Sequence, residues 1–182
     1  MSRQWVALLY SVAVAPGRRV RNEELVALAE GLGFTRPRTL LATGNLIFEA
    51  AAADARAVEA ALEPAFAARL GRPVDIIVRA GDRWPALVRG NPFPGAAERS
   101  PARVSVRVMR APADAAVLER LEPYRTEGER VALVDGDLWV NLPHGTAGSR
   151  LAAAITPARA GGAGTFRNWN TVRKIGDALG RS

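Results

Sequence analysis

One order of strands and helices occurs twice along this chain, and that repeat limits the possible folds more than any other feature. In each half a strand is followed by a helix, a hairpin of two strands, a second helix and a last strand. The hairpins turn at Gly44 and Gly136, and glycine adopts the positive φ angles of tight turns without strain. No residue-level repeat accompanies this order, so the sequence predicts two βαββαβ units on the order of elements alone.

The first unit is predicted from the spacing of its apolar residues. Residues 5–10 form a continuous apolar run, which is typical of a strand buried on both faces. Asn22 is expected to cap a helix that stops at Gly33. The remaining elements are an Ala-rich helix at 54–70, ended by Gly71, and strands at 39–42, 46–49 and 74–78.

The second unit repeats the order. In the segment 103–110, three valines (104, 106 and 108) alternate with Arg103, Ser105 and Arg107, which predicts a strand with one face in water. Asp135-Gly136 predicts a type I′ hairpin turn, and Ser149 is expected to cap a short helix. The other elements are a helix at 113–121, strands at 131–134 and 138–142, a brief strand at 165–167 and a final helix at about 170–179.

These elements place the chain in the α+β class, as two ferredoxin-like (βαββαβ) halves with a C-terminal helix. The pattern leaves open whether the halves share strands. The predicted divisions are 1–80 for the first half, 81–101 for a connecting helix and Pro-rich loop, and 102–182 for the second half with the C-terminal helix.

The chain is basic, with a formal net charge of +7. Positive charge attracts nucleic acid, but all except one of the 25 basic residues are arginine and they are spread along the sequence. Nucleic-acid binding is therefore an alternative that charge alone does not favour. No apolar run is long enough to span a membrane, and the run near the N-terminus is interrupted at Tyr10 and Ser11, so a soluble cytoplasmic protein is expected.

Several kinds of chemistry lack the residues they need. The sequence has no cysteine and a single histidine, His144, so a thiolate nucleophile and a multi-histidine metal site are excluded. No Walker loop or Gly-x-Ser-x-Gly elbow occurs, and no pair of carboxylates requires a catalytic role. We expect no metal and no cofactor, and the sequence leaves open whether the protein is an enzyme.

The candidate site residues lie in turns and at helix starts. Their structural alternatives are a tight turn at Gly44 and helix caps at Ser149 and at Asn168 or Asn170. Their functional interpretation is a small polar or anionic ligand, held by amide, hydroxyl and guanidinium groups where the two halves meet. The predicted ligand-binding set is Thr43, Asn45, Ser149, Arg150, Arg167, Asn168, Trp169 and Asn170.

The most distinctive of these clusters is Arg167-Asn168-Trp169-Asn170. Either an asparagine caps the final helix while Trp169 packs in the core, or the polar side chains face a cleft with Trp169 as its wall. Both interpretations can hold together. Lys174, the single lysine, follows Asn170 by one helical turn and reaches the same helix face, although a solvated charge near a helix end is its simpler interpretation.

The chain resembles the bacterial proteins grouped as domain of unknown function 1697. The resemblance runs from the first strand to the last helix. Its motifs are Val6-Ala7-Leu8-Leu9, Glu24-Leu25, Leu32-Gly33-Phe34-Thr35, Arg38-Thr39, Thr43-Gly44-Asn45-Leu46-Ile47-Phe48, Asn91-Pro92-Phe93-Pro94, Gly148-Ser149-Arg150-Leu151 and Arg167-Asn168-Trp169-Asn170-Thr171-Val172. It implies duplicated ferredoxin-like halves and brings no settled activity. The segment from Tyr10 to Pro16 departs from the Arg-Gly-Ile-Asn-Val-Gly-Gly that is typical of the family, so an activity that uses this loop would be altered or lost.

Three functional hypotheses follow. The first is a protein that binds a small polar or anionic ligand between its halves. The second is a nucleic-acid-binding protein, although residues 45–49 lack the basic and aromatic pattern of RNA-binding sheets. The third is an interaction module that forms homodimers through an edge strand such as 103–110. The oligomeric state stays open in all three.

Overall fold

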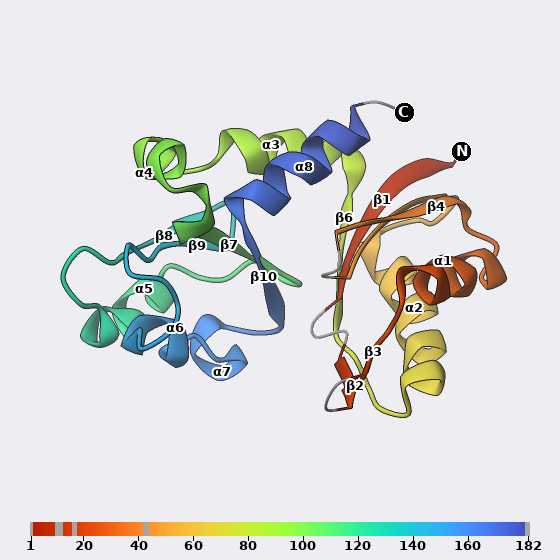
Figure 1. Cartoon of the computed structure of the whole chain (residues 1–182), viewed down its shortest axis with the longest axis horizontal. Helices are drawn as coiled ribbons and strands as arrows, with labels where there is room; N and C mark the ends of the chain where they lie inside the picture. The colour runs from red at the N-terminus through yellow and green to blue at the C-terminus, as the bar shows by residue number, and fades with distance from the viewer. Residues whose placement is uncertain (1, 10–12, 16–17, 42–43, 181–182) are drawn as a thin grey trace. The chain divides into compact units, whose positions relative to one another are not determined.

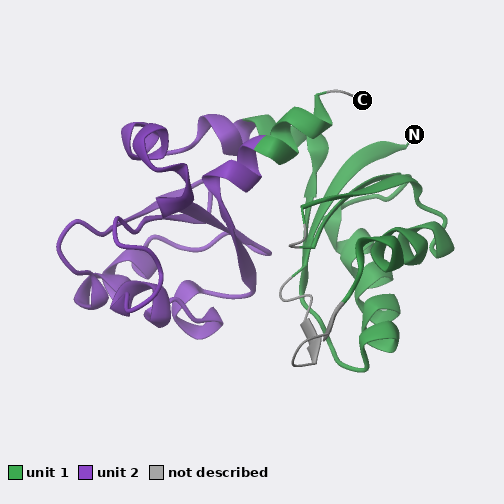
Figure 2. Cartoon of the chain, in the orientation of Figure 1, with its two compact units in different colours: residues 1–85, 174–182 green, residues 86–173 purple. Residues whose placement is uncertain are grey.

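The computed structural model describes residues 2–9, 13–15, 18–41 and 44–180. The chain divides into two compact units, which we call unit 1 (1–85 with 174–182) and unit 2 (86–173) (Figure 2). Each unit contains a four-stranded antiparallel sheet with helices packed on it (Figure 1). The sheets share no strand within the described ranges, and none of the helices there is long and apolar enough to cross a membrane.

The sheet of unit 1 has the strand order β4-β5-β1-β6. Counted along the unit, this is second, third, first and fourth, which is the order of a ferredoxin-like sheet. Its strands are β1 (Arg3–Leu9), β4 (Thr35–Leu40), β5 (Asn45–Ala50) and β6 (Ile76–Ala80), beside a small ribbon of β2 (Ala13–Ala15) and β3 (Arg18–Arg19). Its helices are α1 (Asn22–Gly31), α2 (Ala55–Leu70) and the 3-10 turn η1 (Gly81–Arg83).

The helices α1 and α2 cover one face of this sheet (Figure 1). Trp5, Ala7 and Leu9 of β1 belong to the core under these helices. Val6 and Leu8, which alternate with them, lie on the opposite face and are also fully buried. The unbroken apolar run predicted at 5–10 is explained by this burial on both faces, although Tyr10 lies outside the described residues.

The sheet of unit 2 has the order β10-β7-β9-β8, which is the same permutation of four strands. Its strands are β7 (Val104–Met109), β8 (Arg130–Val134), β9 (Asp137–Asn141) and β10 (Gly164–Asn168). Its helices are α4 (Pro94–Arg99), α5 (Ala116–Leu121), α6 (Arg150–Ala154) and α7 (Pro157–Ala160), with the 3-10 turns η2 (Pro101–Arg103) and η3 (Glu122–Tyr124). Two helices cross the unit boundary: α3 (Trp84–Arg89) and α8 (Trp169–Leu179).

The prediction of one water-exposed face on β7 is wrong. Arg107 is only 3% exposed, and it lies on the face that carries Met109 into the core beneath α5 and α6. Its guanidinium group is 5.7 Å from the centre of the Phe166 ring and donates to the carbonyl oxygen of Gly162. A long side chain can bury its stem among apolar neighbours, so alternation of valine and arginine does not by itself place arginine in water.

The first strand of the first hairpin also begins earlier than predicted. β4 starts at Thr35 rather than Thr39, and it includes Pro37. Proline cannot donate a ladder hydrogen bond, but β4 is an edge strand that pairs only with β5, so one side of it needs no donors. The second hairpin matches its prediction: Asp135 and Gly136 have φ angles of 50° and 80°, as a type I′ turn requires.

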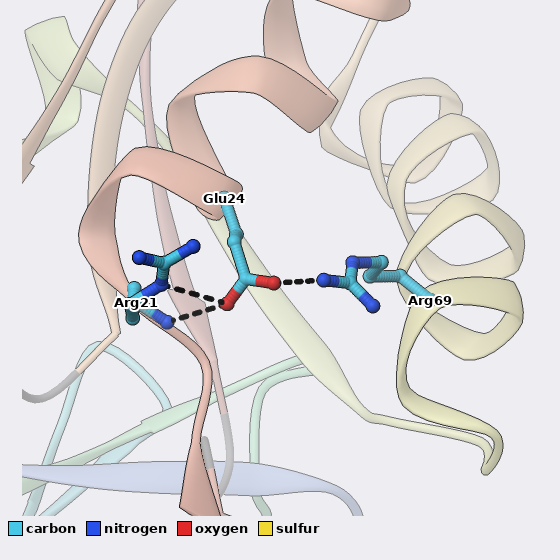
Figure 3. Close-up of polar contacts among 3 residues, drawn as sticks. All are labelled: Arg21, Glu24 and Arg69. Atoms are coloured by element: carbon cyan, nitrogen blue, oxygen red, sulfur yellow. Dashed lines mark hydrogen bonds and ion pairs between the residues drawn. The ribbon is translucent and has the colours of Figure 1, made fainter.

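The start of α1 is fixed differently from the prediction. The N-cap is Arg21 rather than Asn22, and Oε2 of Glu24 accepts a hydrogen bond from the backbone N–H of Arg21 at 3.0 Å. The other carboxylate oxygen of Glu24 pairs with Arg69 of α2 (Figure 3). Glu24 is the third residue of the helix, which is the capping-box position. It therefore closes the first turn of α1 and also links α1 to α2.

Candidate functional site

An open pocket of about 500 Å³ lies in unit 1 between the edge strand β4 and the C-terminal part of α8. The strand contributes Arg36, Arg38, Thr39 and Leu40, and the helix contributes Lys174, Asp177 and Ala178. We call this the β4–α8 pocket. It joins segments that are far apart in the sequence: Nη2 of Arg38 donates a hydrogen bond of 2.9 Å to the carbonyl oxygen of Ala178, 140 residues away.

The backbone of β4 is irregular beside this pocket. The pairing register with β5 shifts between Thr35 and Arg38, and Arg36 has a φ of 51°. Positive φ is uncommon outside glycine, and strained or bulged positions of this kind are enriched at binding sites. The irregular segment carries both arginines of the pocket, so the strain and the positive charge coincide.

The charges of the pocket are unequal. Arg36, Arg38 and Lys174 are positive, whereas Asp177 is the only acidic residue among its lining residues. Arg36 pairs with Glu49 of β5 at 3.0 Å, but its side chain is still 70% exposed. The side chains of Lys174 and Asp177 form no hydrogen bond or ion pair with any residue in the described ranges. An exposed ammonium group without a protein partner in those ranges thus lines the same pocket as two guanidinium groups.

Asn45 supports the strand that forms one wall of this pocket. Its side chain is fully buried, and Nδ2 donates a hydrogen bond of 2.9 Å to the carbonyl oxygen of Leu40, the last residue of β4. This bond fixes the end of the strand behind a pocket-lining residue. Thr43, the other residue predicted in this turn, lies outside the described residues.

Ser149 and Arg150 lie at the start of α6 in unit 2. Ser149 is the N-cap: its Oγ accepts from the backbone N–H of Ala152 at 3.0 Å and donates to Oε1 of Glu129 at 2.5 Å. Arg150 is exposed. The predicted helix cap is confirmed, and the Ser149 hydroxyl has protein partners on both its donor and its acceptor side.

Glu129 is a buried carboxylate that the sequence did not single out. Burial raises its pKa, but the hydrogen bonds from Ser149 and from Thr126 outweigh that effect, so the pKa of Glu129 is lowered below its ordinary value. The electrostatic effect of His144 also lowers the pKa of Glu129. The carboxylate therefore stays ionised and holds the loop before α6 in place.

Arg167 to Asn170 form the junction between β10 and α8. Arg167 is buried, and its Nη1 donates to Oγ1 of Thr165 and to the carbonyl oxygen of Phe166, at 2.9 and 2.8 Å. Burial lowers the pKa of Arg167 to about 10. These hydrogen bonds fix the guanidinium group against its own strand, and its role in ligand binding stays a prediction.

The two asparagines of the junction differ. Oδ1 of Asn168 accepts from both the backbone N–H and the hydroxyl of Thr171, so Asn168 caps α8. Asn170 is exposed on the first turn of the helix. The ring of Trp169 lies 6.0 Å from that of Trp139, in a tilted arrangement. The cap by Asn168 is thus confirmed, whereas Trp169 is half-buried rather than in the core, and the functional interpretation of both residues stays a prediction.

The pocket residues Arg36, Arg38 and Asp177 were missed by the sequence reasoning. The strand was predicted at 39–42, which left both arginines outside it, and Lys174 was noted only as a neighbour of Asn170. A basic pair around a proline before a hairpin is the local signal that was available. Their meeting with α8 depends on tertiary structure.

Comparisons with known proteins agree with this architecture. A search of curated proteins found no match. A solved structure from Streptococcus pneumoniae, described as the conserved bacterial protein SP0830, has a similar fold, with a TM-score of 0.76 over 98% of this chain and 99% of that chain, at 20% sequence identity. The model of the protein family described as "Protein of unknown function (DUF1697)" matches residues 1–139. The chain therefore belongs to the DUF1697 family, as the order of its motifs and its paired ferredoxin-like sheets indicated.

Proposed function

We propose that unit 1 binds a small anionic molecule, of the size of a sugar phosphate, in the β4–α8 pocket. The observation that carries the proposal is the ammonium group of Lys174, which lines the pocket beside Arg36 and Arg38 without a side-chain partner among the described residues. A positive group that forms no ion pair with a protein carboxylate attracts an anion. The cost of removing water from the ammonium group is then offset by its interaction with the bound anion. A volume of about 500 Å³ is also within the range of small-molecule sites.

The lining residues define what the ligand needs besides negative charge. Arginine presents a planar set of donors that suits carboxylate or phosphate oxygens, and lysine contributes a compact point charge. Asp177 accepts hydrogen bonds only, so it favours a ligand that carries hydroxyl or amino donors next to its anionic group. The Thr39 hydroxyl is able to donate or accept. A phosphorylated sugar combines these features.

Asn45 enters the proposal as a supporting residue, because its side chain fixes the end of β4. We assign no catalytic residue. Ligand contacts by Thr43, Ser149, Arg150 and residues 167–170 are not needed for this proposal.

The test compares two variants that change the net charge equally. Lys174→Gln removes the ammonium group in the pocket, whereas Arg173→Gln removes an exposed charge from the preceding position of α8, which does not line the pocket. Isothermal titration calorimetry of the full-length protein would use glucose 6-phosphate, glucose and inorganic phosphate at fixed ionic strength. We expect glucose 6-phosphate to bind the wild type, and Lys174→Gln to weaken it about fivefold or more, the equivalent of roughly 1 kcal/mol. Arg173→Gln is expected to keep the wild-type affinity.

Two outcomes would overturn the proposal. Failure of the wild type to bind either phosphate compound at low salt would remove its basis. Equal weakening by the two variants would show attraction by the net charge rather than a site. In that case, tight binding of a single-stranded oligonucleotide with a steep loss of affinity as salt rises would favour the nucleic-acid alternative.

A further inference from the structure

A separate pocket of about 370 Å³ lies within unit 2, between the sheet and α6. Its walls are mostly apolar: Val140, Leu142 and Phe166 come from the sheet side, and Ile155 follows α6. No charged side chain lines it. We call it the α6 pocket, and it differs from the β4–α8 pocket in its unit, its lining and its lack of charge.

The small residues of α6 explain why the space is not filled. Ala152 and Ala153 form the helix wall of the pocket, and their side chains end at the Cβ atom. The position of this helix is fixed by Ser149, which caps α6 and bonds to the buried carboxylate of Glu129. Thr146 and Ala153 are exposed, so the pocket opens to solvent beside α6 and a small molecule can enter it.

Two hydroxyl groups are the only polar side-chain groups of this lining. Ser105 of β7 and Thr146 of the loop before α6 both line the pocket. Neither side chain makes a hydrogen bond to another residue in the part of the chain that the structure describes. Each hydroxyl therefore has a donor and an acceptor available to a bound molecule. An apolar pocket with a few available polar groups is the usual composition of a small-molecule site.

These features select the chemistry of the occupant. A carboxylate or phosphate would lose hydration without meeting a positive side chain in the lining, so charged molecules are disfavoured. Phe166 presents an aromatic side chain to the pocket, and aromatic rings pack favourably against one another. We propose that the α6 pocket binds a neutral aromatic molecule that carries one hydroxyl or carbonyl group, which hydrogen-bonds to Ser105 or Thr146.

The test uses p-cresol as the neutral ligand, with benzoate as its charged counterpart and toluene as its counterpart without a hydroxyl. Amide NMR spectra of the full-length protein would be recorded through each titration. We expect p-cresol to shift the signals of residues around Thr146 and Phe166, and benzoate to bind about tenfold more weakly or worse, because its charge is buried without a partner. At least one of the variants Ser105→Ala and Thr146→Val is expected to weaken p-cresol binding, and neither is expected to change toluene binding.

A matched pair of variants separates a binding site from a packing gap. Ala153→Leu places a larger side chain in the pocket and is expected to abolish the p-cresol shifts, whereas Ala158→Leu, at an exposed position of α7 outside the lining, is expected to preserve them. The proposal would be overturned if p-cresol caused no localised shifts in the wild type. Shifts that persisted in a folded Ala153→Leu protein, or a preference for benzoate, would also overturn it.

Discussion

The guanidinium group of Arg38 donates a hydrogen bond to the carbonyl oxygen of Ala178, so the edge strand of unit 1 binds the last turn of the C-terminal helix. The last carbonyl groups of a helix lack partners within it, and a cation there also interacts favourably with the helix dipole. This bond fixes one side of the β4–α8 pocket independently of any ligand.

Arg38→Met should therefore loosen the end of α8. The expected loss is about 1 kcal/mol in the free energy of unfolding, because a partly buried hydrogen bond from a charged donor is removed. Amide hydrogen exchange should become faster in the last turn of α8. Arg36→Met is the control: its ion pair with Glu49 is exposed, so a change within about 0.5 kcal/mol is expected. Unchanged exchange at residues 176–180 in Arg38→Met would contradict this role.

The cap of α8 gives a second prediction. Asn168→Ala removes the acceptor of two hydrogen bonds from Thr171 and should cost about 1 kcal/mol by urea denaturation. Asn168→Asp keeps a side-chain oxygen and should retain most of the stability. Asn170→Ala, two residues further along and exposed, should change the stability by less than about 0.5 kcal/mol. Equal losses at both asparagines would argue against the cap.

The sequence predicted the elements whose causes are local. The turn at Asp135-Gly136 follows from the backbone angles that these residues adopt, and Ser149 caps the helix α6 that begins directly after it. Both features could therefore be predicted from a few neighbouring residues. The order of elements then gave the fold class, because few topologies accommodate two βαββαβ units. The resemblance to the family pointed to the same architecture.

The features that the sequence did not reveal are set by tertiary contacts. Arg107 is buried because the sheet face beneath α5 and α6 encloses its long side chain. The strand that contains Pro37 exists because its position at the sheet edge removes the need for a donor. The β4–α8 pocket combines Arg38 with Ala178 across 140 residues, and no local pattern encodes that distance.

Ser149→Ala should both destabilise unit 2 and change the titration of Glu129. It removes the cap of α6 and the hydrogen bond to the Glu129 carboxylate, at an expected cost of about 1–2 kcal/mol. The pKa of Glu129 should rise, because burial remains while one of the bonds that lower the pKa is lost. Side-chain NMR titration of Glu129 would measure this. Ser149→Thr keeps the hydroxyl and should keep the low pKa, and a pKa unaffected by Ser149→Ala would contradict the assignment.

Glu24 predicts a pH dependence of stability with a definite sign. The backbone N–H of Arg21 is the main cause that lowers its pKa below the ordinary value of 4.5, and the charges of Arg69 and Arg21 add to it against the effect of burial. A carboxyl with a lowered pKa in the folded state stabilises the protein above its ordinary pKa, and this contribution is lost as the pH falls through the folded value. The difference in urea midpoint between wild type and Glu24→Gln should therefore be present at neutral pH and vanish in acid.

Glu23→Gln is the matched control for this titration. Glu23 is exposed and its side chain makes no hydrogen bond or ion pair within the described ranges, so at neutral pH the Glu23→Gln variant should differ less from the wild type in urea midpoint than Glu24→Gln does. A Glu24→Gln difference that stayed constant from neutral pH to well below 4.5 would contradict the assignment.

Alanine substitutions at two glycines with nearly equal φ angles would separate the cost of backbone strain from the cost of a steric clash. Gly136 and Gly148 have φ angles of 80° and 78°. A Cβ atom at Gly136 would lie 2.7 Å from Cα of Pro112, whereas a Cβ atom at Gly148 would meet nothing within 4 Å. Gly148→Ala should thus cost about 1 kcal/mol for the positive φ alone. Gly136→Ala should cost at least about 1 kcal/mol more, because the backbone at Pro112 has to move. Urea denaturation would measure the loss in the free energy of unfolding for both variants. Equal losses would contradict the prediction, because they would mean that the backbone at Pro112 moves without an energetic cost.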